Sequence, residues 1–163
     1  MNALAFVRQS VGRDALALLP PEMTSPAAVA MLIAIGWQES RFEKRLQMGG
    51  GPARGYWQFE LGGVSAAMGP RANAAALNAA AAKLGYTTPL TRNFCYTAIA
   101  YQDVLACVCA RLLLWNVPAP LPTREQPNEG WSQYIAAWNP GRPKPATWPF
   151  AWDIGWASIP PQN

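Results

Sequence analysis

Alanine dominates this chain, and no segment alternates β-branched with polar residues as a half-buried strand does. The 163 residues include 29 alanines, and alanine has the strongest intrinsic preference for the α-helix. Prolines and glycines separate the helical patterns and mark the loops between them. We therefore expect a mainly α-helical fold.

Six segments have the residue pattern of a helix. The second has a well-marked start, because Ser25 is a favourable N-cap and Pro26 suits the first helical position. The fourth is the longest and has only Asp103 and Arg111 as charged residues, so we expect it to be the central buried helix. The fifth follows Asn128 as N-cap, and the sixth carries a stripe of tryptophans that we expect to pack in the core. The six segments span residues 3–18, 26–39, 72–84, 93–115, 129–138 and 148–158.

Length and composition predict one domain. A chain of 163 residues can bury a sizeable core without the help of metals or disulfides, and 51% of its residues are apolar. No internal repeat and no second composition regime is visible. We therefore expect a single domain over residues 1–163.

The absence of histidine from the sequence excludes several classes of catalyst. Ser-His-Asp catalysis, Cys-His catalysis and the HExxH zinc site all require histidine, and no GxxxxGK[ST] phosphate loop is present. We therefore expect neither a metal nor another cofactor. An acid–base enzyme would draw its catalysts from nine carboxylates: Asp14, Glu22, Glu39, Glu43, Glu60, Asp103, Glu125, Glu129 and Asp153.

The charge pattern and the cysteines predict partners and redox state. The net charge of +4 is modest and the basic residues are scattered, so no nucleic-acid partner is expected. Three cysteines cannot form a complete disulfide framework, and Cys107 and Cys109 point to different faces of a helix. We expect these two residues and Cys95 to be buried, reduced thiols.

The N-terminus does not have the pattern of a signal peptide. Arg8, Arg13 and Asp14 fall where such a peptide needs an apolar stretch. The longest uncharged run, residues 23–38, is too short to cross a membrane. We therefore expect a protein made in the cytoplasm without a signal peptide and without an integral membrane segment.

Glu39 is the first candidate for a catalytic group. It follows an apolar helical run and lies near the predicted C-terminal end of that helix. Burial disfavours the charged carboxylate, and so does the negative end of the helix dipole. Both effects raise a carboxyl pKa towards the range of a general acid, although an ordinary exposed helix-end glutamate would fit the same pattern.

Three short motifs add to this argument. They are residues 39–42 (ESRF), 55–59 (GYWQF) and 136–141 (AAWNPG). In the same order, they resemble the Glu-Ser-x-Phe, Gly-Leu-Met-Gln-aliphatic and Ala-Ala-Tyr-Asn-Ala-Gly motifs of the lytic transglycosylase and goose-type lysozyme superfamily. The resemblance covers about residues 26–141. The residues within the motifs are most similar to those of bacteriophage-encoded members.

The resemblance implies a fold and an activity. It implies a lysozyme-like helical domain with a substrate cleft, with the motif-bearing core at about 26–141 and a tryptophan-rich C-terminal helix at 148–158. The implied activity is cleavage of the β-1,4 bond between N-acetylmuramic acid and N-acetylglucosamine in peptidoglycan. The enzyme would be a muramidase, which is a lysozyme-like hydrolase, or a lytic transglycosylase, and its partner would be the peptidoglycan glycan strand.

The resemblance also implies roles for single residues. Glu39 matches the general acid that protonates the glycosidic oxygen, and Ser40 matches the neighbour that orients the structure around it. Gln58 and Asn139 match amides that hydrogen-bond the sugar or the catalytic carboxyl, although both amides could instead cap loops.

Three aromatic residues depart from the family pattern. Trp138 stands where the family usually has a tyrosine, and an indole offers one donor and no acceptor, so the tyrosine's hydrogen bond to the acid is expected to be lost or altered. Tyr56 and Trp57 replace an aliphatic pair. We expect these two rings either to stack on sugar faces in the cleft or to fill the core.

Glu60 bears on the type of reaction. It follows Gln58-Phe59, where goose-type lysozymes carry an aspartate, and a second carboxylate can activate water on the opposite sugar face. A hydrolase would place Glu60 at ~6.5–9.5 Å from Glu39. Without such a group, the family's lytic transglycosylases close a 1,6-anhydro ring with the substrate's own hydroxyl. A helix-start glutamate would explain Glu60 equally well.

The resemblance to bacteriophage members implies a biological setting. The enzyme would act on the bacterial cell wall, in the periplasm, during lysis or during penetration of the host wall. Without a signal peptide, it would depend on a holin for export or on association with the virion. The alternative is a non-catalytic peptidoglycan-binding or virion structural module that retains the cleft.

Overall fold

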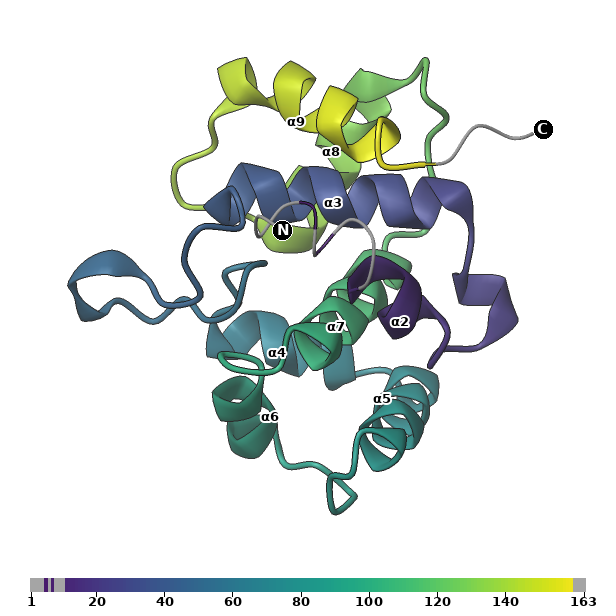
Figure 1. Cartoon of the computed structure of the whole chain (residues 1–163), viewed down its shortest axis with the longest axis vertical. Coiled ribbons are helices and arrows are strands. Elements are labelled where there is room, and N and C mark those ends of the chain that lie inside the picture. The colour runs from purple at the N-terminus through teal and green to yellow at the C-terminus, as the bar shows by residue number, and fades with distance from the viewer. Residues whose placement is uncertain (1–4, 6, 8–10, 160–163) are drawn as a thin grey trace.

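The computed structural model describes residues 5, 7 and 11–159, and most of them are helical (Figure 1). Within these residues there is no β-strand, and the only pairing of that kind is two isolated bridges, from Arg54 to Leu46 and to Phe59. The prediction of a mainly α-helical fold is therefore confirmed. The described helices are α2 (Gly12–Leu16), α3 (Pro26–Ser40), α4 (Leu61–Met68), α5 (Arg71–Lys83), α6 (Arg92–Ala98), α7 (Asp103–Trp115), α8 (Pro127–Trp138) and α9 (Trp148–Trp156).

Three single-turn 3₁₀ helices join these elements: η2 (Pro21–Met23), η3 (Met48–Gly50) and η4 (Pro145–Thr147). The N-terminal part of the helix predicted at 3–18 falls largely outside the described residues, and its described part is α2. Within the described residues, no helix combines the length and the apolar character needed to cross a bilayer.

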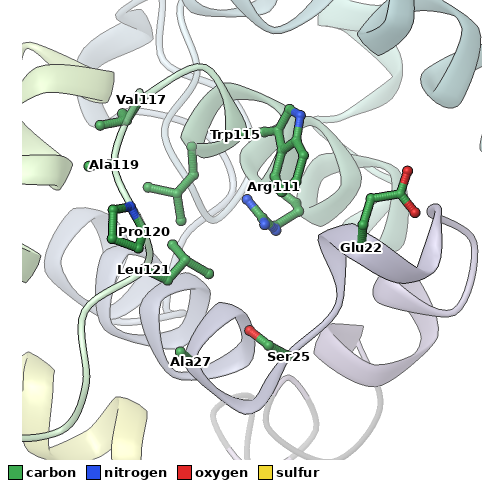
Figure 2. Close-up of a pocket in the computed structure, with 10 residues that line it drawn as sticks. Glu22, Ser25, Ala27, Arg111, Trp115, Val117, Ala119, Pro120 and Leu121 are labelled. Atoms are coloured by element: carbon green, nitrogen blue, oxygen red, sulfur yellow. The ribbon is translucent and has the colours of Figure 1, made fainter.

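Helix α7 lies at the centre of the fold, as its composition predicts. It packs against α2, α3, α4, α5 and α8, and every residue from Leu105 to Leu114 is buried. The buried set includes Arg111 (Figure 2), and its Nε donates to the carbonyl of Met23 at 2.7 Å. The core therefore forms around one apolar helix that carries a single buried cation.

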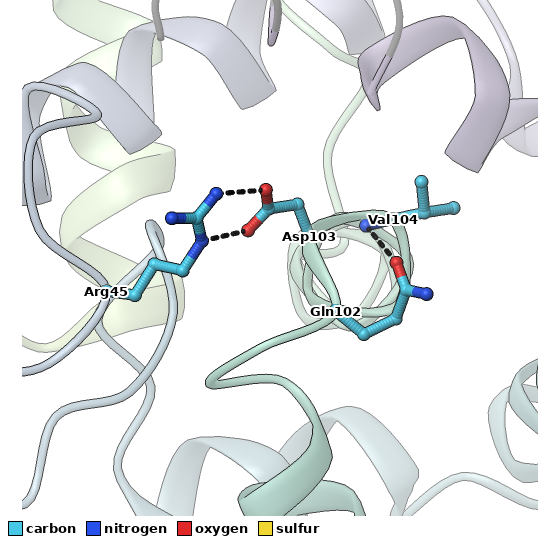
Figure 3. A network of polar contacts seen from close by, with 4 residues as sticks. All are labelled: Arg45, Gln102, Asp103 and Val104. Atoms are coloured by element: carbon cyan, nitrogen blue, oxygen red, sulfur yellow. Dashed lines mark hydrogen bonds and ion pairs between the residues drawn. The ribbon is translucent and has the colours of Figure 1, made fainter.

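The prediction of one helix over 93–115 is wrong. The chain leaves the helix after Ala98 and starts a new one at Asp103. The side chain of Gln102 caps the new helix, because its Oε1 accepts from the backbone N–H of Val104 at 3.2 Å (Figure 3). The break lets α6 fold back beside α4 and α7.

The cysteines lie where the two halves of this broken helix meet. The Sγ atoms of Cys95 and Cys109 are 3.6 Å apart. Cys107 is buried as well, and all three are free thiols. Their predicted burial is therefore confirmed.

Helix α3 begins as predicted. The Oγ of Ser25 accepts from the backbone N–H of Ala28 at 3.0 Å, and Pro26 occupies the first helical position. Helix α9 crosses α3 closely: a Cβ added at Gly155 would lie 2.3 Å from the carbonyl oxygen of Ala30. Glycine at this position is what allows the two helices to approach.

Three other predicted helices are present with small differences. The alanine-rich segment forms α5, and Gly85 follows its end with a φ of 86°. Helix α8 begins at Pro127, with Gln126 rather than Asn128 at the N-cap. The tryptophan stripe lies on α9, where Trp148 and Trp152 are each 3% exposed and pack in the core as expected. Helix α4 was not predicted.

Candidate active site

Glu39 is the next-to-last residue of α3, and the ESRF motif builds the turn that follows it. Arg41 and Phe42 both adopt the left-handed conformation, with φ of 53° and 57°, which ends the helix. The Oγ of Ser40 stabilises this turn: it accepts from the backbone N–H of Phe42 at 3.1 Å and donates to the carbonyl of Gly36 at 3.2 Å. Ser40 therefore shapes the backbone beside Glu39.

The turn directs the ring of Phe42 into the core. The ring is fully buried against Gly36, and a Cβ added at Gly36 would lie only 2.4 Å from it. A larger residue at position 36 would displace the ring. Glycine one turn before Glu39 is thus part of how this helix end is built.

The GYWQF motif forms a tight loop closed by backbone hydrogen bonds. Arg54 and Phe59 exchange two N–H···O bonds of 2.9 and 2.8 Å. Gly55 and Gln58 have positive φ, and a Cβ added at Gly55 would lie 2.7 Å from the carbonyl oxygen of Ile99. The amide of Gln58 donates to the carbonyl of Gly55 at 3.0 Å, which holds its side chain against its own loop.

The two aromatic residues of this loop are core residues. Trp57 is fully buried and its Nε1 donates to the carbonyl of Leu32 at 2.8 Å. Tyr56 is 4% exposed and lies under the guanidinium of Arg45, 4.4 Å from the ring centroid. Rings this deeply buried have no face free for a sugar, so their expected stacking on substrate is wrong and the core-filling alternative holds.

Helix α8 provides the hydrogen bond that the Trp138 substitution was expected to remove. The Oη of Tyr134 donates to Oε1 of Glu39 at 2.6 Å. Trp138 lies one turn further along α8, and its Nε1 donates to the carbonyl of Trp57 at 3.0 Å. The indole therefore joins α8 to the GYWQF loop, while a tyrosine on the same helix face holds the carboxyl.

The ring of Tyr134 is itself held in place by packing. It stacks on Trp148 of α9, with 5.4 Å between ring centroids and 8° between planes. It is 3% exposed. Tyr134 was not among the predicted site residues, although its spacing of four residues from Trp138 places the two on one face of a helix.

The carboxyl of Glu39 has an environment that favours its protonated form. Burial raises its pKa from 4.5 to about 7, while the hydrogen bond from Tyr134 and the charge of Lys144 act in the opposite direction. A carboxyl with a pKa near neutrality holds a transferable proton and accepts it back at ordinary pH.

Glu39 lines a cavity of about 380 Å³ at the end of α3. The amide of Gln38 closes one side, because its Nε2 donates to the carbonyl of Lys144 at 3.0 Å and its Oε1 accepts from Thr147 Oγ1 at 2.9 Å. The remaining lining comes mostly from the loop that follows α3. The lining residues are Trp37, Gln38, Glu39, Ser40, Arg41, Glu43, Lys44, Leu46, Gln47, Met48, Gln58, Lys144 and Thr147.

The structure brings Glu39, Ser40 and Gln58 together in this cavity, and the other five predicted site residues fall outside its lining: the buried Tyr56 and Trp57, and Glu60, Trp138 and Asn139. Glu60 is exposed at the N-cap position of α4. Asn139 is exposed and ends α8 with a φ of 44°, which is the loop-capping role left open above. Trp138 is partly buried against the GYWQF loop.

Trp37 and Glu43 line the cavity although neither was among the predicted site residues. Trp37 is partly exposed and packs edge-on against Phe150 with ring centroids 4.9 Å apart. The guanidinium of Arg41 lies 5.3 Å from the centroid of Trp37. Glu43 supplies a second carboxylate to the cavity.

An ion pair anchors the loop that forms much of the cavity. The guanidinium of Arg45 donates twice to Asp103, from Nε at 2.8 Å and from Nη2 at 2.7 Å (Figure 3). Asp103 is the first residue of α7. The ion pair therefore attaches the loop after Glu39 to the central helix.

No protein family, curated protein or solved structure compared with the chain matches it. Among the described residues, no three Cys, Asp or Glu side chains gather closely enough to hold a metal ion.

Proposed function

We propose that the protein is a peptidoglycan-degrading glycosidase with a lysozyme-like fold, which cleaves the β-1,4 bond between N-acetylmuramic acid and N-acetylglucosamine. The observation that carries the proposal is Glu39: a carboxyl with a pKa of about 7 that lines a cavity and accepts a hydrogen bond from Tyr134. A general acid that works at neutral pH must hold its proton there, and a pKa near 7 allows a carboxyl to do so.

In the proposed reaction, Glu39 donates its proton to the glycosidic oxygen as the bond from that oxygen to the muramic acid C1 breaks. The proton transfer leaves a carboxylate, and the hydrogen bond from Tyr134 stabilises that charge. Tyr134 acts through Glu39, so it is a positioning residue.

We propose the lytic transglycosylase route for the second half of the reaction. Glu60 does not line the cavity of Glu39, which removes the main support for a water-activating role of that residue. The carboxylate of Glu39 would instead take the proton of the sugar's own C6 hydroxyl as its oxygen attacks C1. The ring closes as a 1,6-anhydro sugar, no water is consumed, and the acid regains its proton.

The cavity lining suits a polymer that has both sugar and peptide parts. Trp37 presents a partly exposed ring on which a sugar face can stack. Lys44 and Lys144 bring positive charge to the same cavity, which suits the carboxylates of stem peptides. The setting we propose is bacteriophage lysis or penetration of the host wall, with delivery by a holin or with the virion.

Substitution of Glu39 tests the proposal. Glu39→Gln keeps the shape but removes the transferable proton, so release of muropeptides from purified cell walls should fall ~10²–10⁴-fold. Glu129→Gln, an exposed change on α8, is the matched control and should retain full activity. Near-normal turnover by Glu39→Gln would remove the general acid. A wild type that binds walls but releases nothing would favour the non-catalytic module.

Mass spectrometry of the released muropeptides tests the route. We expect 1,6-anhydro ends, which are lighter than reducing ends by one water, from the wild type and from Glu60→Gln alike. Reducing ends would contradict the transglycosylase route. If they disappeared in Glu43→Gln, they would assign water activation to Glu43, the other carboxylate in the lining.

A further inference from the structure

A second cavity, of about 520 Å³ (Figure 2), lies at the start of α3, whereas Glu39 lies at the end of this helix. It is lined by the start of α3, the last turns of α7 and the proline-containing loop after α7. Ser25 and Glu39 are fourteen residues apart on this helix, which corresponds to roughly 20 Å at the usual rise per residue. The cavity is therefore separate from the proposed active site.

Arg111 supplies this cavity with an incompletely bonded cation. It is 2% exposed, its Nε donates to the carbonyl of Met23 at 2.7 Å, and its guanidinium lies 4.8 Å from the ring centroid of Trp115. Its Nη1 is buried and has no hydrogen-bond partner among the described residues. Burial lowers the pKa of Arg111 to about 10, which leaves the group charged at neutral pH.

No carboxylate of the described chain pairs with this cation. The ion pairs among the described residues join Arg13 to Asp14 and Arg45 to Asp103. Glu22 lines the cavity, but Figure 2 shows its carboxylate turned away from Arg111. A buried charge without a counter-ion is unfavourable, and an anion bound beside it would relieve that cost.

The rest of the lining limits the anion that would fit. Most of it is apolar and comes from Leu114, Val117, Pro120 and Leu121. Ser25 faces the same space (Figure 2), at the positive end of the 15-residue helix α3. The site offers one guanidinium, one hydroxyl and apolar walls. A ligand that carries a single negative charge on an apolar body would match these groups.

We propose that the Arg111 cavity is a binding site for a small monocarboxylate with an aliphatic body, whose carboxylate pairs with Arg111 near the start of α3. Such a group exists in short free fatty acids and at the C-terminus of a peptide of small apolar residues. Phosphate fits less well, because it carries more charge into a largely apolar space with Glu22 at its rim. The inference does not depend on the proposed glycosidase activity.

Calorimetric titration with three probes tests the site. The probes are butyrate, acetyl-Ala-Ala with a free carboxylate, and the same dipeptide as its C-terminal amide. We expect a carboxylate to bind and the amide to bind at least tenfold more weakly. Tighter binding of butyrate assigns the site to free acids, and tighter binding of the dipeptide assigns it to a peptide end. Binding of neither carboxylate, or equal binding of the amide, overturns the proposal.

Variants locate the binding in this cavity. Arg111→Met replaces the cation by an apolar chain of similar length and should reduce carboxylate affinity at least tenfold. If that variant does not fold, Ala119→Trp fills the cavity from an exposed loop and should have the same effect. Glu22→Gln removes a negative charge from the rim and should raise the affinity about twofold or more at low salt, while Asp153→Asn, an exposed change on α9, should leave it unchanged.

The two proposals have separate outcomes. Glu39→Gln should bind the carboxylate probes as the wild type does, because Glu39 lies at the far end of α3. Unchanged affinity in Ala119→Trp, or in a folded Arg111→Met, overturns the Arg111 site and leaves the glycosidase proposal standing.

Discussion

The carboxyl of Glu39 is held by a tyrosine one helical turn away from where the motif resemblance places it. Tyr134 and Trp138 lie on one face of α8 and divide two tasks: the phenol bonds the acid, and the indole bonds the GYWQF loop. A helix face tolerates such a shift, because residues four apart project in nearly the same direction. The side chain that reaches Glu39 therefore depends on how α8 is set against α3.

Tyr134→Phe tests this contact. The ring and its stacking on Trp148 remain, but the donor to Glu39 is lost. Because that hydrogen bond lowers the pKa of Glu39, its removal should raise the pKa and move the alkaline limb of the activity profile to higher pH. A hydrogen bond to a charged group contributes about 1.5–3 kcal/mol, so kcat should fall roughly 10–100-fold. An unchanged pH profile would show that Tyr134 serves packing alone.

Glu39 should also make the stability of the fold depend on pH. Its pKa in the folded state, about 7, lies above its ordinary value of 4.5, so the folded protein binds the proton more tightly. The stabilisation is fully present below pH 4.5 and is lost as the pH rises through about 7. Glu39→Gln does not titrate, so its Tm should rise relative to the wild type between pH 4 and pH 8. A constant difference in Tm over that range would contradict the raised pKa.

At the scale of elements, the sequence predicts those helices whose ends carry a clear signal. Ser25 and Pro26 mark the start of α3, and Gly85 marks the end of α5. The break between α6 and α7 has no proline or glycine. Gln102 caps the new helix locally, and across the break the sulfurs of Cys95 and Cys109 meet at 3.6 Å. Helix α4 was missed because Gly62 and Gly63 lower the helix propensity of a segment that packing makes helical.

Gly36→Ala tests how the end of α3 is built. A Cβ at this position would lie 2.4 Å from the buried ring of Phe42, so the turn after Glu39 must shift. We expect a loss of about 1–3 kcal/mol in the free energy of unfolding, measured by urea denaturation, together with lower activity. Gly62→Ala is the matched control: its Cβ meets open space on α4, and the better helix propensity should stabilise by about 0.5–1 kcal/mol. Equal stability of the two variants would argue against the packing role of Gly36.

At the scale of the whole molecule, the candidate site combines segments that are far apart in the sequence. The motifs identified Glu39, Ser40 and Gln58 as site residues, because each lies in a short segment with a recognisable order of residues. They did not identify Tyr134, whose contact spans 95 positions. The prediction that Trp57 binds substrate was wrong, because the sequence of a loop does not show whether an aromatic ring faces a sugar or the core. The helical fold was predictable from composition, while these contacts depend on how the helices pack.

The Arg45–Asp103 pair joins the loop after α3 to the central helix, and Asp103→Asn tests what that attachment contributes. Asp103 is 11% exposed in its side chain and Arg45 42%, so the pair is mostly a surface interaction and global stability should change by about 1 kcal/mol or less. The local effect should be larger, because the loop residues that line the cavity lose their anchor.

Limited trypsin digestion measures this effect, since the loop offers cleavage sites at Arg41, Lys44, Arg45 and Arg54. We expect cleavage within 41–54 to be several-fold faster in Asp103→Asn than in the wild type, and KM for cell walls to rise more than kcat falls, because the acid itself is untouched. Asp14→Asn breaks an exposed ion pair elsewhere and should change neither rate. If the loop is cleaved equally slowly in all three proteins, packing of Tyr56 and Phe42 beneath it is sufficient to hold it, and the ion pair adds little to the site.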